Sequence, residues 1–428
     1  MSKTRTAQLK RPVRYRLLRG GCILLLAGLA LALSRSTHAR ADTQVVDPHV
    51  VYIFGSQITF TATLESDVSI LGAHLYFNRP EDEDTTPNVV PVSVDDQGVM
   101  VYDYDLMRYP LRAFSQVKYW FEVTLAGGVT VSSVPEEFDY VDNRFVWQEL
   151  QSGPFRVHWY EGDSNFGQEL LIMAQIGLQQ AKNWLPVDDP KEVNIYAYAS
   201  AQDMRSTNML AGTNWVAGHA DPDLNLIEVS LPPGPEQKTE MERQIPHELM
   251  HILLYQFVGQ AYNTKLPSWL KEGLASVNEI YPNPYYHTIL SQAAAKGSLL
   301  SFSDICQNFP VDASGAYLAY AQAASFTRYL FDRYGAEGIK SLVESYKQSS
   351  VMDCSNGTVN ALGATQPQLE QDWRQAVLGE KPISPQEGTP LAWVTILGVV
   401  LLVPMVVLLT NAFRRSRRPQ STASGRAA

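Results

Sequence analysis

The chain has 428 residues, 34 of them basic and 44 acidic, and its formal net charge is −10. Nine basic residues precede Asp42 and five follow Leu391, which leaves 20 basic residues in the segment 42–391. All 44 acidic residues lie in this segment, so its formal net charge is −24. A surface this acidic argues against nucleic acid or anionic lipid as a ligand.

Residues 1–41 have the pattern of a secretory signal peptide. Seven basic residues and no acidic residue occupy the first twenty positions, and an apolar run follows from Cys22 to Leu33. Ala39-Arg40-Ala41 then has the small-x-small form of a cleavage site. We therefore expect the mature chain to begin near Asp42; a retained N-terminal anchor is the alternative.

The segment 42–142 predicts a β-sandwich domain. Turn-rich clusters separate stretches in which apolar and polar residues alternate, at 57–64, 70–77, 89–94, 99–104 and 117–125. Strands at this spacing, without helical periodicity, are typical of a small antiparallel sandwich of immunoglobulin or fibronectin type. The segment carries no catalytic constellation, so a spacer, adhesion or substrate-docking role stays open.

The segment 143–379 predicts a second domain of mixed α+β class, entered through a hinge at 142–147. A helix is expected at 166–185, capped by Asp163 or Ser164. Strands are expected at 155–160, 193–198, 213–218 and 224–231. His158, on the first of these strands, is interpreted as structural.

The motif His247-Glu248-Leu249-Met250-His251 indicates a metal site. Residues four apart lie on one face of a helix, so His247 and His251 can bind one ion while Glu248 reaches its water. Glu272, twenty-one residues after His251, can supply a carboxylate ligand and leave one tetrahedral position open, as catalytic zinc requires. The alternative, two solvated histidines on an amphipathic helix, conflicts with the apolar flank 252–258.

Two details of the helices around this motif follow from proline and serine. Pro246 either starts the helix of the two histidines or kinks a longer helix that begins near Thr239. Pro267 and Ser268 open the helix of Glu272, with Ser268 as its expected cap.

The two motifs, together with Trp269-Leu270 and Gly273-x-Ala275 around Glu272, resemble the gluzincin metallopeptidases, specifically the peptidase MA-like domains. Thermolysin and aminopeptidase N are more distant relatives, and the resemblance covers roughly residues 144–378. It implies a zincin-type catalytic domain with one Zn²⁺, a peptide or protein substrate, and Glu248 as general base. Gluzincins often brace a ligand histidine with an acid four positions after the ligand glutamate; here Ser276 holds that position, and Glu279 is a weaker substitute.

The resemblance also implies an edge strand that holds extended substrate and a donor to the oxyanion. The edge strand would run through residues 215–220, with Trp215 and Gly218 at the substrate edge and His219 either facing substrate or structural. Tyr320, on a helix expected at 317–334 with a Gly335 stop, is the candidate donor. Tyr317 is its rival, and both could instead be core aromatics.

Cys306 and Cys354 are the only cysteines that remain after signal cleavage. Two cysteines in an oxidising compartment most often pair, so we expect a disulfide. Two buried thiols are the alternative, and thiolate zinc ligands are disfavoured because neither residue belongs to a Cys-x-x-Cys motif.

The C-terminal residues predict a membrane anchor. A Pro/Gly-rich linker at 380–390 leads to an apolar segment at 391–411, and a basic tail at 412–428 follows. The tail places the C-terminus in the cytoplasm and the catalytic domain outside. The sequence thus predicts a single-pass membrane zinc metallopeptidase of undetermined oligomeric state; a non-catalytic zincin-scaffold binding or adhesion protein and a metal hydrolase of non-peptide bonds are the alternatives.

Overall fold

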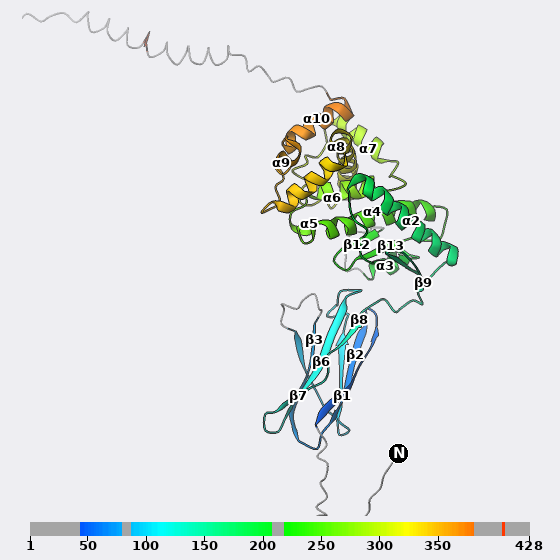
Figure 1. Cartoon of the computed structure of the whole chain (residues 1–428), viewed down its shortest axis with the longest axis vertical. Helices are drawn as coiled ribbons and strands as arrows, with labels where there is room; N and C mark the ends of the chain where they lie inside the picture. The colour runs from blue at the N-terminus through cyan, green and yellow to red at the C-terminus, as the bar shows by residue number, and fades with distance from the viewer. Residues whose placement is uncertain (1–42, 79–86, 208–217, 381–404, 407–428) are drawn as a thin grey trace, which may run out of the picture. The chain divides into compact units, whose positions relative to one another are not determined.

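The computed structural model describes residues 43–78, 87–207, 218–380 and 405–406. The chain divides into two compact units, with the boundary between Phe145 and Val146 (Figure 1). The first is β-rich and the second combines a sheet with many helices, so the predicted α+β class with an N-terminal β-rich region is confirmed.

The first unit consists of two antiparallel sheets around one apolar core. One sheet has the order β1-β2-β5 and the other β4-β3-β6-β7, with β8 also paired to β6. The strands are β1 (Gln44–Ile53), β2 (Gln57–Glu65), β3 (Ile70–Asn78), β4 (Asn88–Val92), β5 (Val99–Asp105), β6 (Gln116–Leu125), β7 (Thr130–Ser132) and β8 (Glu136–Asp139). Alternate residues of β2 and β6 point inward, and Phe60 packs on Phe77 across the two sheets.

Strand β1 was not predicted as a separate strand, and its backbone gives the reason. Asp47 has a positive φ of 52°, and the pairing of β1 with β2 shifts register between Val46 and His49. A bulge of this kind breaks the alternation of apolar and polar residues on which strand prediction depends.

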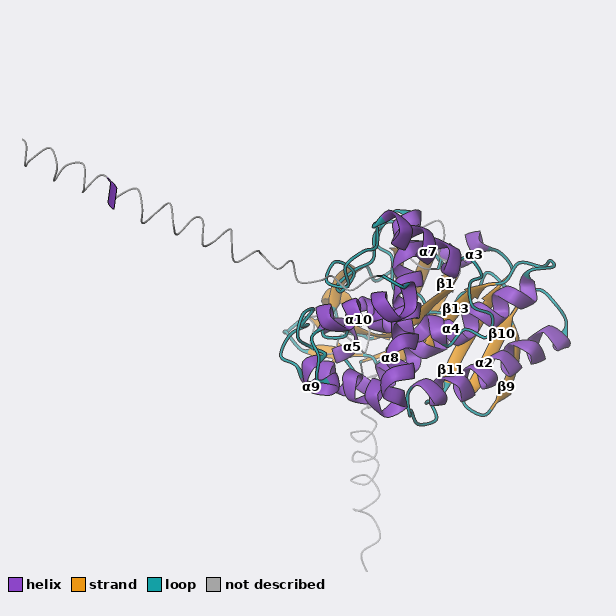
Figure 2. Ribbon diagram, turned by 90° about the horizontal axis from the view of Figure 1, so that it is seen from above, coloured by secondary structure: helices purple, strands orange, loops and turns teal. Residues whose placement is uncertain are grey.

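The second unit contains a five-stranded mixed sheet of order β12-β13-β11-β10-β9. Its strands are β9 (Gln148–Ser152), β10 (Phe155–Trp159), β11 (Val193–Tyr198), β12 (Gly218–Asp221) and β13 (Leu226–Ser230). The three central strands are parallel, whereas β9 and β12 are antiparallel to their neighbours and form the two edges. Helices α2 (Ser164–Trp184) and α4 (Gln237–Val258) pack on one face of this sheet (Figure 2).

Helix α3 (Ala201–Arg205) contacts β11 and β13 of the sheet. The remaining helices form the other part of this unit. They are α5 (Ala261–Thr264), α6 (Ser268–Val277), α7 (Tyr286–Lys296), α8 (Ala313–Gln348), α9 (Val359–Leu362) and α10 (Gln366–Leu378). Gly335, with φ 68°, interrupts α8 where the helix stop was predicted, but helical residues continue beyond it to Gln348. The expected Ser268 cap was wrong: Pro267 is the N-cap of α6, and the Ser268 hydroxyl instead donates to the carbonyl of Gln307.

The predicted signal peptide, cytoplasmic tail and membrane span lie outside the described residues, apart from Met405 and Val406 of the span. Within the part of the chain that the structure describes, no helix is both long and apolar enough to cross a bilayer.

Candidate active site

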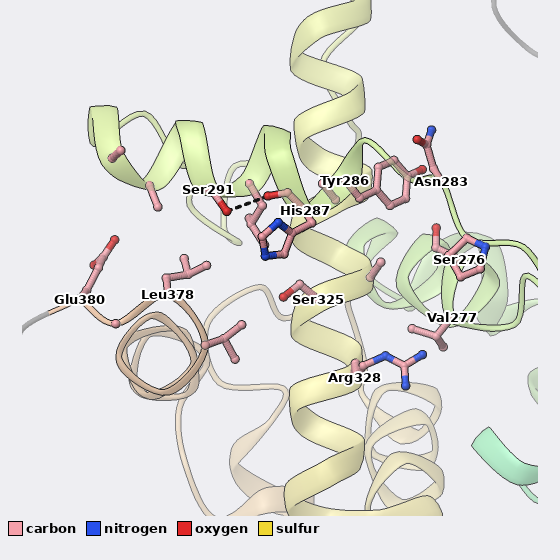
Figure 3. A pocket seen from close by; sticks show the side chains of 18 residues that line it. Ser276, Val277, Asn283, Tyr286, His287, Ser291, Ser325, Arg328, Leu378 and Glu380 are labelled. Carbon is pink, nitrogen blue, oxygen red and sulfur yellow. Dashed lines mark hydrogen bonds between the residues drawn. The ribbon is translucent and has the colours of Figure 1, made fainter.

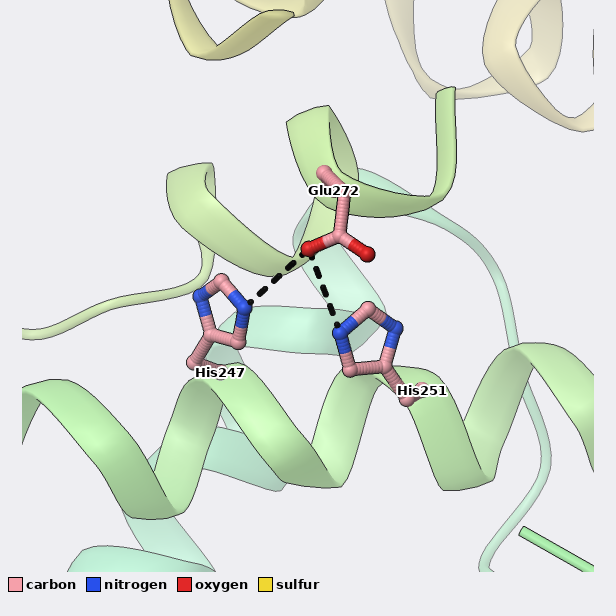
Figure 4. Close-up of side chains that lie close together, drawn as sticks. All are labelled: His247, His251 and Glu272. Atoms are coloured by element: carbon pink, nitrogen blue, oxygen red, sulfur yellow. Dashed lines mark ion pairs between the residues drawn. The ribbon is translucent and has the colours of Figure 1, made fainter. Parts of the chain in front are cut away.

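Helices α4 and α6 bring His247, His251 and Glu272 to one point (Figure 4). His247 Nε2 lies 3.5 Å and His251 Nε2 lies 3.6 Å from the same oxygen, Oε2 of Glu272. One possible ligand atom from each residue falls within 4.8 Å of the other two. Two imidazole nitrogens and a carboxylate at this separation are a donor set that suits a zinc ion with one open position.

The opposite nitrogen of each imidazole is also held. His247 Nδ1 lies 3.0 Å from Glu279 Oε1, and His251 Nδ1 lies 2.9 Å from the Tyr262 hydroxyl. Oxygen partners at Nδ1 orient each ring and leave Nε2 facing Glu272, which is the arrangement that metal-binding histidines usually have. Glu279 thus holds His247 from just beyond the end of α6, and Tyr262, on α5, is a contact that the sequence did not predict.

Pro246 explains how Glu279 reaches this position. Proline has no N–H, so the carbonyl of Glu242, four residues earlier in α4, loses its partner in the helix. That carbonyl accepts instead from Ile280 N at 3.0 Å, and the Asn278 amide donates to the carbonyl of Pro246 at 2.7 Å. The proline therefore lies inside a longer helix, and the gap that it leaves anchors the turn of Glu279.

Glu248 lies between this cluster and the sheet edge. Gly218, the first residue of β12, passes so close that a Cβ there would stand 2.7 Å from Glu248 Oε1. Among the described strands β12 pairs only with β13, so it is an edge strand of the sheet, as expected for this segment. Trp215, the other predicted edge residue, lies outside the described residues.

His219 does not share the position of Gly218. Successive side chains of a strand point to opposite faces, and His219 is the register partner of Glu228 on β13. Its Nε2 lies 3.6 Å from Asp221 Oδ1. His219 therefore points to the opposite face of β12 from Gly218, and its role, facing substrate or structural, stays a prediction.

The charges at the cluster favour a cation. Burial lowers the pKa of the His247 imidazole, but Glu272 and Glu279 outweigh burial and hold that pKa well above its ordinary value. Burial alone would raise the pKa of Glu272, yet the imidazoles of His251 and His247 bring it well below its usual range. The three side chains therefore face a point where positive charge is stabilised.

Tyr320 and Tyr317 both line a cavity of about 400 Å³, together with Gly218, His247, Glu248 and Tyr286. The cavity adjoins the candidate metal cluster, by which we mean the group His247, His251 and Glu272. The Tyr320 ring centroid lies 6.2 Å from that of His247, whereas Tyr317 is 43% exposed. Burial, followed by the charges of Glu272 and Glu248, raises the pKa of the Tyr320 hydroxyl well above 10. Tyr320 thus keeps its proton and can act as a hydrogen-bond donor.

Cys306 and Cys354 form a disulfide across 48 residues, with their Cα atoms 5.8 Å apart. The bridge joins the loop before α8 to the loop that follows it.

Residues 173–379 match the model of a protein family described as the Peptidase MA superfamily. This region is a peptidase MA domain. The match includes α4 and α6, the helices that carry His247, His251 and Glu272, so the resemblance that the motifs suggested is confirmed. It supports a function of peptidase type.

Other comparisons add little to this assignment. No curated protein matches the chain. Among solved structures, an aminopeptidase N family protein from Idiomarina loihiensis is 9% identical, with a TM-score of 0.31 and coverage of 77% of this chain and 73% of that one. A polysaccharide deacetylase from Bacillus cereus is 10% identical, with a TM-score of 0.20, and the match covers 38% of this chain and 53% of the deacetylase.

Proposed function

We propose that the peptidase MA domain is a zinc-dependent peptidase, with one Zn²⁺ held by His247, His251 and Glu272. The observation that supports this most directly is the orientation of the two imidazoles. Both Nε2 atoms face one oxygen of Glu272, while both Nδ1 atoms have oxygen partners. This donor set fits zinc, and Glu248 and Tyr320 line the cavity beside it.

Zinc bound there would lower the pKa of a water molecule and polarise the scissile carbonyl of a peptide. Glu248 accepts the proton of the attacking water and passes it to the nitrogen of the leaving amine. The free edge of β12 aligns the extended peptide, and Gly218 leaves room for the Glu248 carboxylate next to that edge. Tyr320 donates a hydrogen bond to the oxyanion that forms at the scissile carbon.

Substitution of the general base tests this proposal. Glu248→Gln should bind zinc as the wild type does, because Glu248 is not among the ligands, yet it should not turn over peptides, since an amide cannot accept the proton. Metal analysis of the purified protein, combined with cleavage of a peptide library, measures both properties. A Glu248→Gln protein that still cleaved peptides would refute the mechanism, and a wild-type protein that bound zinc without cleaving any peptide would favour a binding scaffold.

We further propose that the protein is exported and anchored in a membrane by residues 391–411, with the catalytic domain outside the cytoplasm. The sequence patterns at both termini support this proposal, and the Cys306–Cys354 disulfide is typical of an oxidising compartment. Sequencing of the N-terminus of the membrane-bound protein should begin near Asp42. An N-terminus at Met1 or Ser2 would contradict signal cleavage.

A further inference from the structure

A second and larger cavity, of about 700 Å³, lies in the same unit, next to the cavity that His247, Glu248 and Tyr320 line (Figure 3). Its walls come from α6, α7, α8 and α10. Four alanines, two on α7 and two on α8, leave the space between these helices unfilled: Ala294, Ala295, Ala321 and Ala324. The volume is within the range of roughly 300–1,000 Å³ that is usual for ligand pockets.

The two cavities share part of their walls. Asn283 and Tyr286 line both of them, and Ser276, one helical turn after Glu272, lines the larger one. Figure 3 shows these three residues at one end of the larger cavity and Leu378 at the other. The two cavities therefore adjoin at Asn283 and Tyr286.

The lining indicates which kind of group would fit. Three of its side chains can carry a charge: His287, Arg328 and Glu380. Arg328 stacks on Trp184 at 4.8 Å, and Glu380 Oε1 lies 3.8 Å from Arg374. About half of the remaining wall is alanine, leucine and valine, and the rest includes serine hydroxyls, the Asn283 amide and the Tyr286 ring. An apolar group gains most from such a wall, because it gives up contact with water without needing a charged partner.

We propose that this cavity receives a large apolar side chain of the peptide whose scissile bond lies at the metal cluster. The preferred substrates are then peptides with a residue of the size of leucine, phenylalanine or tryptophan near the point of cleavage. This inference rests on the proposed function of the metal site, and it adds the substrate class.

Cleavage of a peptide series tests the inference. Internally quenched peptides carry glycine, leucine, phenylalanine or tryptophan at one position at a time in a glycine–serine background. At one position the wild type should cleave the phenylalanine peptide roughly 10- to 100-fold faster in kcat/KM than the glycine peptide, as expected for burial of one such side chain. Ala324→Phe and Ala295→Phe, which fill the cavity from opposite helices, should bring this ratio close to one.

A matched control keeps the effect specific. Gln292→Phe adds the same ring to α7 at an exposed position outside the cavity, and it should retain the wild-type ratio. Thermal melting shows which variants are folded, and Ala295→Phe carries the test if Ala324→Phe does not fold. A wild type without the preference, or a preference that survives both cavity substitutions, would overturn the inference.

Binding separates this inference from the proposed catalytic function. In the Glu248→Gln protein, calorimetric titration should give a roughly 10- to 100-fold lower Kd for the phenylalanine peptide than for the glycine peptide. The added Ala324→Phe substitution should remove that difference. Equal affinity for both peptides, or no binding of either, would reject the pocket even if the wild type proves to be a peptidase. Selective binding without turnover in the wild type would reject only the catalytic function.

Discussion

Gly218 offers a test of the catalytic geometry that leaves every proposed zinc ligand in place. Alanine would add a Cβ 2.7 Å from Glu248 Oε1 and 3.1 Å from Glu248 Cγ. Ordinary van der Waals contact begins at 3.4 Å, so the carboxylate must move by about 0.7 Å. Gly218 has no positive φ, and the colliding atoms belong to a flexible side chain, so the fold should accept alanine.

The expected consequence is a loss of turnover without a loss of zinc or stability. A displacement of about 0.7 Å at a proton-transfer group should lower kcat roughly 10- to 100-fold. The free energy of unfolding should change by less than about 1 kcal/mol, because no backbone contact is disturbed. Peptide hydrolysis, metal analysis and urea unfolding of the Gly218→Ala protein measure the three quantities.

Gly273 provides the contrasting variant. A Cβ at Gly273 would lie 2.7 Å from the backbone oxygen of Ala323 and would also collide with Thr327, so α6 and α8 would have to separate. Gly273→Ala should therefore lower the free energy of unfolding by roughly 1–3 kcal/mol. If Gly218→Ala instead turned over at the wild-type rate, the position of Glu248 against β12 would have no bearing on catalysis, and the steric reasoning would be refuted.

Further variants test the ligand set, the oxyanion donor and the disulfide. Glu272→Ala should weaken zinc binding by at least about 100-fold, as measured with a competing chelator, because loss of a residue that only supports a ligand can already lower metal affinity by that factor. Unchanged affinity would mean that another residue is the third ligand. Tyr320→Phe should lower kcat roughly 10²- to 10³-fold with little change in KM, whereas Tyr317→Phe should leave kcat as it is. Replacement of Cys306 and Cys354 by serine should cost about 4 kcal/mol in the free energy of unfolding, and peptide mapping that found both thiols free in the wild type would exclude the bridge.

Local periodicity explains why parts of this site could be predicted from the sequence. The spacing of His247 and His251 fixes their relation on any helix, and the apolar flank of α4 requires that helix to be buried. The Gly335 interruption follows equally from one residue type. Each of these inferences depends on residues within a few turns of one another.

Contacts between distant segments could not be predicted in this way. Tyr262 reaches His251 from a helix of four residues that has no motif. Glu279 was expected only as a weaker brace, because the sequence does not show the carbonyl of Glu242 that holds its turn. The cavity that the four alanines line depends on how four helices pack against one another, and the spacing of residues in the sequence does not predict that packing. The Ser268 cap failed for a similar reason, because the hydroxyl of Ser268 bonds to a residue thirty-nine positions away.

Pro246 also limits how this site can change by mutation. A residue with an N–H at position 246 would draw the carbonyl of Glu242 back into its own helix and release Ile280. The turn of Glu279 would then need a new anchor before His247 could keep its partner. Substitutions at 246 and at 278–280 should therefore be epistatic. A chimera that takes only one of these two segments from a relative should lose its metal, whereas a chimera that takes both segments should retain it.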